Sequence, residues 1–231
     1  MSASDERVTD DPGLSAALAG QAPLQLGDLL RRAAAALGGT KRWVLLGLLV
    51  WLSVAVVATV FGLMLGLSDL VAGSLSVIAT APVTLALTMY AVRRVAGVPT
   101  DMDALMAYRP AIGHAVVVTL LASLVLTASE ALVGPTWSLP LTLLYGLLTG
   151  QALFLVGDRG VDAFTAIGWS VRASLPVLPT LLVLQLTLAA VVLLGTLAFG
   201  IGLIWAAPFA VLALGAVSYR LFGTRAAPQA G

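Results

Sequence analysis

Six apolar stretches, each about as long as a helix that crosses a membrane, dominate the sequence. A membrane-spanning helix needs roughly 20 largely apolar residues. The six stretches are Trp43–Leu67, Leu70–Val92, Ile112–Leu132, Trp137–Val156, Leu178–Phe199 and Leu203–Phe222. Charged residues make up only 10% of the chain, against about 25% in soluble domains. So few charges cannot cover a water-facing surface. We therefore expect an all-α integral membrane protein with six transmembrane helices.

Glycine and proline divide or interrupt these stretches. The last two form one long apolar run, and Gly200 and Gly202 supply the turn between them, because glycine readily adopts positive φ. Pro82 and Pro208 lie inside the second and sixth stretches, where neighbouring helices can satisfy the carbonyl that a proline frees. Trp205 follows the glycine turn, and we expect it to anchor the sixth span at the outer interface.

The basic residues all lie on one side of the expected spans. The 12 lysines and arginines are Arg7, Arg31, Arg32, Lys41, Arg42, Arg93, Arg94, Arg109, Arg159, Arg172, Arg220 and Arg225. They precede the first span, follow the sixth, or lie in the loops after the second and fourth. Cytoplasmic loops of membrane proteins carry an excess of Lys and Arg. We therefore predict a multi-pass protein of the bacterial cytoplasmic (inner) membrane with both termini in the cytoplasm.

Three segments on the predicted cytoplasmic side show helical periodicity. The apolar face of the first segment is Leu26, Leu29, Leu30 and Ala33, and that of the third is Phe164, Ile167, Val171 and Leu175. In the middle segment, Thr100 or Asp101 could cap a short helix whose apolar face is Met102, Leu105 and Met106. Spacings of three and four predict amphipathic helices lying at the membrane surface before spans one, three and five. The resulting threefold pattern fits either internal duplication or unrelated, evenly spaced hairpins.

The two ends of the chain differ from its apolar centre. Residues 1–25 carry Asp5, Glu6, Asp10 and Asp11 and have no long apolar run. They predict a disordered acidic tail, either simply solvated or engaged in regulation or partner binding. Residues 26–222 are expected to form the six-helix transmembrane domain, and residues 223–231 a short cytoplasmic tail.

Polar side chains inside the spans are candidate functional positions, because they are costly to place in lipid. These candidates are His114 and Glu130 in the third span, Gln151 in the fourth and Gln185 in the fifth. His114 and Glu130 are separated by roughly 24 Å along a helix, so they cannot share a site. Gln151 could bond His114 across a helical hairpin. Glu130 is either an outward-facing interface acid or an inward-facing proton or cation site.

Two glycine pairs favour close helix packing. Gly62 and Gly66 in the first span, and Gly146 and Gly150 in the fourth, have the four-residue spacing that lets helices approach closely. They are consistent with packing inside the chain, with a membrane-protein partner, or with a homo-oligomer.

No known catalytic or cofactor motif occurs in the sequence. The chain has no cysteine and one histidine, which excludes disulfides and multi-histidine metal sites. The serine-hydrolase, zinc-protease and phosphate-loop patterns also do not occur. We therefore expect no enzymatic activity, no cofactor and no metal. The formal net charge of +1 gives no reason to expect a nucleic-acid partner.

Three segments resemble one family. They are the run from Leu194 to Arg220, with GIGLIW, a later proline and a closing Tyr-Arg; DRGVDAFTAIGWSVRAS at Asp158–Ser174; and YAVRRVAGVPTDMDALMAYRP. Together they resemble the YciC-like bacterial membrane proteins, which group with the membrane domain attached to some glycerophosphodiester phosphodiesterases. The resemblance covers about residues 28–222. It implies a six-span fold of no established activity, and it brings no catalytic residues.

Two functions remain open from the sequence. The first is a non-enzymatic scaffold, assembly or regulatory protein in the bilayer, which the packing motifs and amphipathic segments favour. The alternative is a transporter or channel for a small or lipid-like solute, for which the few polar residues in the spans offer a sparse pathway.

Overall fold

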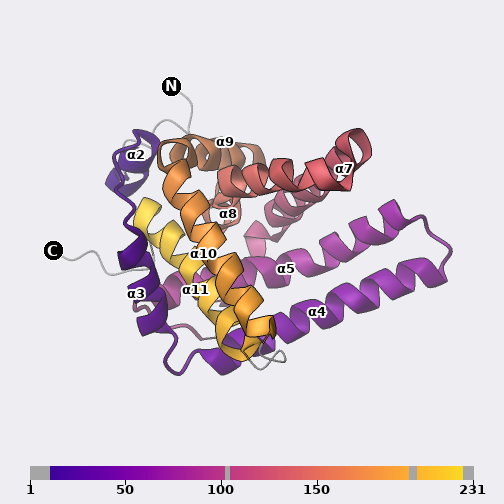
Figure 1. Cartoon of the computed structure of the whole chain (residues 1–231), viewed down its shortest axis with the longest axis horizontal. Helices are drawn as coiled ribbons and strands as arrows, with labels where there is room; N and C mark the ends of the chain where they lie inside the picture. The colour runs from indigo at the N-terminus through magenta and orange to yellow at the C-terminus, as the bar shows by residue number, and fades with distance from the viewer. Residues whose placement is uncertain (1–10, 102–104, 198–201, 226–231) are drawn as a thin grey trace.

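The computed structural model describes residues 11–101, 105–197 and 202–225, and its regular elements are helices (Figure 1). The helices are α2 (Pro12–Leu18), α3 (Leu26–Ala36), α4 (Lys41–Met64), α5 (Asp69–Val95), α7 (Ile112–Thr149), α8 (Ala152–Arg159), α9 (Ala163–Ser174), α10 (Leu178–Leu197) and α11 (Leu203–Phe222). Single turns of 3-10 helix, η1 (Arg109–Ala111) and η2 (Leu175–Val177), lead into α7 and α10.

Five of the helical segments that could cross a membrane match the expected ones closely, and the fifth along the chain begins earlier because it includes α9. Within the described residues, 6 are long and apolar enough: Lys41–Met64, Val71–Val95, Arg109–Gly134, Thr136–Arg159, Ala163–Leu197 and Leu203–Phe222. This confirms an all-α, multi-pass fold class. The third and fourth segments meet inside α7 at Gly134, where φ is 77° and ψ is 166°. A side chain would be strained at that φ, so glycine makes this turn possible.

Prolines and glycines behave differently in the second and sixth segments. Helices α5 and α11 continue across Pro82 and Pro208, as the sequence predicts. Gly202, in contrast, has φ −63° and ψ −22°, so the expected positive-φ turn is wrong at this residue. Glycine is required at this position because α10 comes close to it. An added Cβ at Gly202 would lie only 2.5 Å from Cα of Gly195. Gly200 lies outside the described residues.

The buried core lies where α2, α3, α8, α9 and α11 gather around the C-terminal end of α5. The rings of Phe154 and Phe222 stack there with centroids 5.9 Å apart. Helices α5 and α11 cross closely at Gly215, where an added Cβ would lie 2.8 Å from Ala91. Outside this core, α4 exposes apolar side chains along most of its length, as expected of a helix facing lipid.

The expected disordered tail is wrong for residues 11–25. Asp11 caps α2 by accepting a hydrogen bond from the backbone amide of Leu14 at 3.0 Å. Leu14 and Ala17 are then fully buried in the core, which is enough to hold a short helix in place. Residues 1–10 lie outside the described residues.

Two of the three amphipathic segments form complete helices, with different buried faces. In α3, Leu29 and Ala33 of the predicted apolar face are fully buried in the core of the protein. In α9 the buried face consists of small residues, namely Ala163, Ala166, Ser170, Ala173 and Ser174. Of the predicted apolar stripe, Phe164 (71% exposed) and Leu175 are exposed, whereas Ile167 and Val171 are half-buried. The middle segment lies partly outside the described residues. A membrane-surface position for these helices remains a prediction.

Helices α10 and α11 form a hairpin that runs across the direction of α4 and α5 (Figure 1). At the start of α11, the Trp205 ring contacts the ammonium group of Lys41 at the start of α4. The sequence places these two residues at opposite membrane surfaces. Because the hydrocarbon core is about 30 Å thick, Trp205 cannot anchor the far interface while it touches Lys41. That expectation is therefore wrong in this structure.

Candidate functional site

The two ionisable residues predicted inside the third span do not build a site. His114 and Glu130 both lie on α7 with exposed side chains. The choice between the two alternatives for Glu130 stays a prediction. In the part of the chain that is described, neither residue has a side-chain hydrogen bond or ion pair to another residue. Gln185 is half-buried in α10.

Gln151 belongs to a buried polar cluster rather than to a pair with His114. Its side-chain oxygen Oε1 accepts a hydrogen bond from the Ser218 hydroxyl at 2.5 Å. Its backbone amide donates to the Ser170 hydroxyl at 3.2 Å, and that hydroxyl donates to the Leu148 carbonyl at 2.8 Å. All three residues are at least 95% buried: Gln151 is 5% exposed, Ser170 0% and Ser218 3%. The cluster connects the break between α7 and α8 to α9 and α11.

The expected glycine packing holds at one of its four positions. A Cβ at Gly62 would lie 2.8 Å from Cβ of Ala72, so Gly62 allows α4 to approach α5. Gly66 has φ +68° and open space around it, so it serves the turn after α4. Gly146 and Gly150 are exposed. A Cβ added at either position would touch no other described helix.

A buried ion-pair network joins the two ends of the described chain. The guanidinium of Arg159, at the end of α8, donates to the Asp11 carboxylate and to the Phe222 carbonyl. Its Nε also lies 3.4 Å from Asp158. The Asp158 carboxylate accepts from the Thr224 hydroxyl at 2.6 Å and from the backbone amide of Arg225 at 3.2 Å. The side chains of Arg159 and Asp158 are 4% and 2% exposed, so this network is shielded from water.

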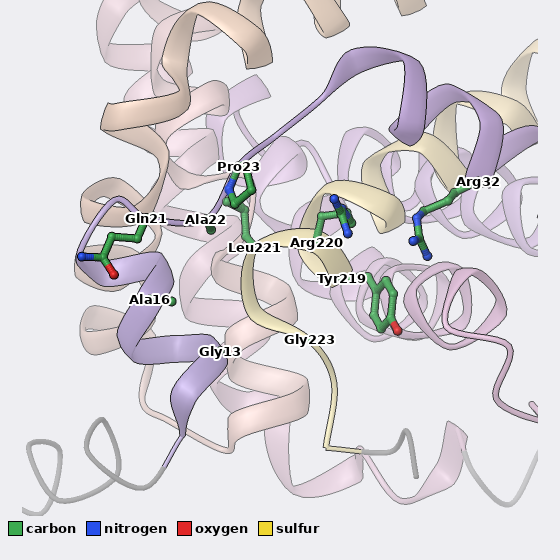
Figure 2. Close-up of a pocket in the computed structure, with 10 residues that line it drawn as sticks. All are labelled: Gly13, Ala16, Gln21, Ala22, Pro23, Arg32, Tyr219, Arg220, Leu221 and Gly223. Carbon is green, nitrogen blue, oxygen red and sulfur yellow. The ribbon is translucent and has the colours of Figure 1, made fainter. Parts of the chain in front are cut away.

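Beside this network, a cavity of about 370 Å³ opens between α2, the link to α3, and the end of α11. Its lining includes Gln21, Pro23, Arg32, Tyr219, Arg220 and Leu221. Figure 2 shows Arg32, Tyr219 and Arg220 toward one end of the cavity and Gln21 toward the other. Two arginines from segments far apart in the sequence therefore share one small space.

A single carboxylate, Asp28, lies next to both arginines. Nε of Arg32 and Nε of Arg220 are each 3.1 Å from its Oδ2 atom. The hydrogen bond from Arg32, followed by the positive charges around it, holds the pKa of Asp28 below its usual range. Asp28 thus stays ionised at neutral pH and holds the two guanidinium groups near one another. The guanidinium of Arg32 also lies over the Tyr219 ring, 5.8 Å from its centroid.

Of the residues in these three clusters, only Gln151 was among the candidates predicted from the sequence. In the sequence, Asp11 falls in a predicted disordered tail, although an aspartate followed by a proline is a common start of a helix. Arg32, Arg159 and Arg220 serve there only as markers of orientation. The Ser218 hydroxyl carries no sequence pattern that distinguishes it from other small residues in apolar helices.

The three clusters have different chemical capacities. The Gln151 and Arg159 clusters have their main polar groups bonded to one another, so they are suited to holding segments together. The arginine cavity combines open space with positive charge, which suits it to an anion. No family model, curated protein or solved structure matches this chain.

Proposed function

We propose that this chain is a non-enzymatic protein of the bacterial cytoplasmic membrane that assembles or regulates partner proteins. The observation that carries the proposal is the bonded polar cluster of Gln151, Ser170 and Ser218. Polar groups in a solute pathway need to be free to exchange partners with the solute. Here they hold α8, α9 and α11 together, as interhelical hydrogen bonds in membrane proteins commonly do.

The surface of α4 supports the same proposal. Its residues Leu46, Leu49, Leu52, Val56 and Val57 are each at least 50% exposed. A helix with such a surface lies against lipid, against another membrane protein or against a second copy of the chain. A scaffold would use this surface for a partner, and its own core would stay intact.

Cross-linking in native membranes tests the proposal. The chain has no cysteine, so Leu49→Cys introduces a single thiol on the exposed face of α4. Val44→Cys, at a fully buried position of the same helix, is the matched control. We expect a thiol-directed cross-linker to give a reproducible adduct with Leu49→Cys and none with Val44→Cys. Equal adducts from both variants, or none from either, would count against a partner on this face.

A transporter or channel for a small or lipid-like solute is the competing function. Flux and lipid-scrambling assays on the purified protein in proteoliposomes distinguish it from a scaffold. We expect both activities to equal those of protein-free vesicles. Solute flux or scrambling above that background would reject the scaffold proposal.

The proposed orientation places both termini in the cytoplasm, on the strength of the one-sided lysines and arginines. Reporter fusions after Arg94, Arg159 and Arg225 are expected to report cytoplasm. For Arg225 this requires that α11 begins on the far side, which the contact of Trp205 with Lys41 opposes, so this fusion decides between the two arrangements. A fusion after Arg94 that reports the far side would reverse the orientation of the first hairpin. The resemblance to the YciC-like proteins is a further part of the proposal, supported by the segments that carry it.

A further inference from the structure

The arginine cavity differs from the other polar clusters because its cations have unused donors. Arg32 and Arg220 each approach Asp28 through Nε. Among the described residues, the terminal Nη groups of the two arginines have no hydrogen-bond partner. The single carboxylate of Asp28 neutralises only one of the two guanidinium groups, so the Asp28–Arg32–Arg220 cluster carries a net positive charge. The remaining N–H donors are arranged in two planar forks, which match the oxygens of a phosphate.

The place of the cavity in the fold restricts which anion can reach it. Tyr219 and Arg220 lie in the last turn of α11, a helix long and apolar enough to span a membrane. Tyrosine and arginine at the end of such a helix lie at the level of the lipid headgroups. With α11 spanning a membrane, a ligand in the cavity meets water on one side and headgroups on the other. Both sources of phosphate, lipid and soluble, are present at that depth.

The size and walls of the cavity fit a phosphate with a small organic substituent. A volume of about 370 Å³ is larger than a single phosphate requires. Pro23 and Leu221 supply apolar wall, and Gln21 supplies an amide at a distance from the arginines (Figure 2). The side chains of Arg32 and Arg220 are 38% and 32% exposed, so an incoming anion can reach them without unfolding the site.

We propose that this cavity binds a phosphate group through Arg32 and Arg220, with the phosphate carried by an anionic lipid headgroup or by a soluble phosphate compound. Asp28 has two roles in this site. It orients the two guanidinium groups, and it competes with the ligand for their positive charge. Removing the charge of Asp28 therefore strengthens phosphate binding, whereas removing the charges of the arginines weakens it.

Two binding measurements on the full-length protein separate the sources of phosphate. In detergent, inorganic phosphate is titrated at constant ionic strength against chloride, and the thermal unfolding midpoint is followed. In vesicles of phosphatidylcholine with added phosphatidylglycerol, native mass spectrometry measures how much phosphatidylglycerol stays bound after release. A response to inorganic phosphate identifies a soluble ligand, and retention of phosphatidylglycerol alone identifies a lipid headgroup. Either result supports the site.

Three variants assign the binding to this cavity. The double variant Arg32→Gln with Arg220→Gln is expected to bind about tenfold more weakly or worse, since it loses charge-assisted hydrogen bonds to the anion. Arg31→Gln is the matched control, because Arg31 is exposed on the same helix and bonds only the Gly27 carbonyl. Asp28→Asn keeps both arginines and is expected to bind at least as tightly as the wild type.

The proposal fails on any of three results. Wild-type protein that binds neither ligand overturns it, and so does a double variant that binds as the wild type does. If the double variant does not fold, the test rests on phosphate binding by Asp28→Asn. Weaker binding by this variant than by the wild type overturns the proposal.

Discussion

The ammonium group of Lys41 lies on the face of the Trp205 indole, with Nζ 2.6 Å from the ring centroid. This is the geometry of a cation–π contact, in which the negative face of the ring attracts the charge. The contact joins the start of α4 to the start of α11, next to the close approach of Gly202 to Gly195. It places the N-terminal end of α11 beside the cationic start of α4.

A double-cysteine variant, Lys41→Cys with Trp205→Cys, is expected to form a cross-link with a short bismaleimide. No native cysteine competes for the reagent. The matched control pairs Lys41→Cys with Met64→Cys at the other end of α4 and is expected to give none. Labelling of positions 41 and 205 by a membrane-impermeant thiol reagent from opposite sides of the membrane would contradict the contact between Lys41 and Trp205. It would instead support the predicted place of Trp205 at the far interface.

Replacing Arg159 with glutamine is expected to lower the free energy of unfolding by about 3 kcal/mol or more. The variant leaves the buried carboxylate of Asp158 and the partly buried carboxylate of Asp11 without their cation, and breaking a buried pair in this way is costly. Thermal unfolding in detergent measures the loss, and proteolysis of residues 11–25 reports release of α2. Arg109→Gln, at an exposed arginine, is the control. Equal stability of the two variants would contradict the network.

Replacing Ser218 with alanine is expected to cost about 1 kcal/mol, because it leaves the buried side-chain oxygen of Gln151 without its donor. Unfolding by heat or by SDS in mixed micelles measures the difference from wild type. The control is Glu130→Gln, which changes an exposed polar side chain on α7 and should remain within about 0.5 kcal/mol of wild type. If Glu130→Gln lost more unfolding free energy than Ser218→Ala, the hydrogen bond between Ser218 and Gln151 would not be the more important contact for stability.

Asp162 caps α9, accepting hydrogen bonds from the backbone amides of Phe164 and Thr165 at 3.1 and 3.0 Å. The Thr165 side chain, and then these amides, hold the pKa of Asp162 below the unfolded value of 3.8. The stability that this ionisation contributes is present above the unfolded pKa, and it is lost as the pH falls through the lower folded pKa.

Asp162→Ala is therefore expected to destabilise the protein by about 1 kcal/mol at pH 7. The difference from wild type should shrink as the pH is lowered below about 4. Asp162→Asn keeps a neutral cap and should lose less stability at pH 7. A deficit of Asp162→Ala that stayed constant through the acid range would show that the charge of the cap plays no part.

The sequence by itself determined the helices that could span a membrane. Apart from the fifth, which begins at Ala163 rather than Leu178 because it includes α9, their bounds agree with the apolar stretches to within a few residues. The break at Gly134 falls between the third and fourth stretches. This succeeds because a helix in lipid satisfies its backbone hydrogen bonds internally, so its existence depends on local composition and length. The short helix α2 was missed, since its stability depends on burial of Leu14 and Ala17 against distant segments and on the pairing of its cap, Asp11, with Arg159.

Only the tertiary structure decided which polar groups meet. Asp11 and Arg159 are 148 residues apart in the sequence, and Gln151 and Ser218 are 67 apart. Their contacts depend on the rotation and crossing of helices, as does the place of Trp205 beside Lys41. A helix that is apolar all round carries no pattern telling which face is buried, and α4, α7 and α10 are helices of that kind. The close approaches of Gly215 to Ala91 and of Gly202 to Gly195 supply that missing information, because they fix where the backbones cross.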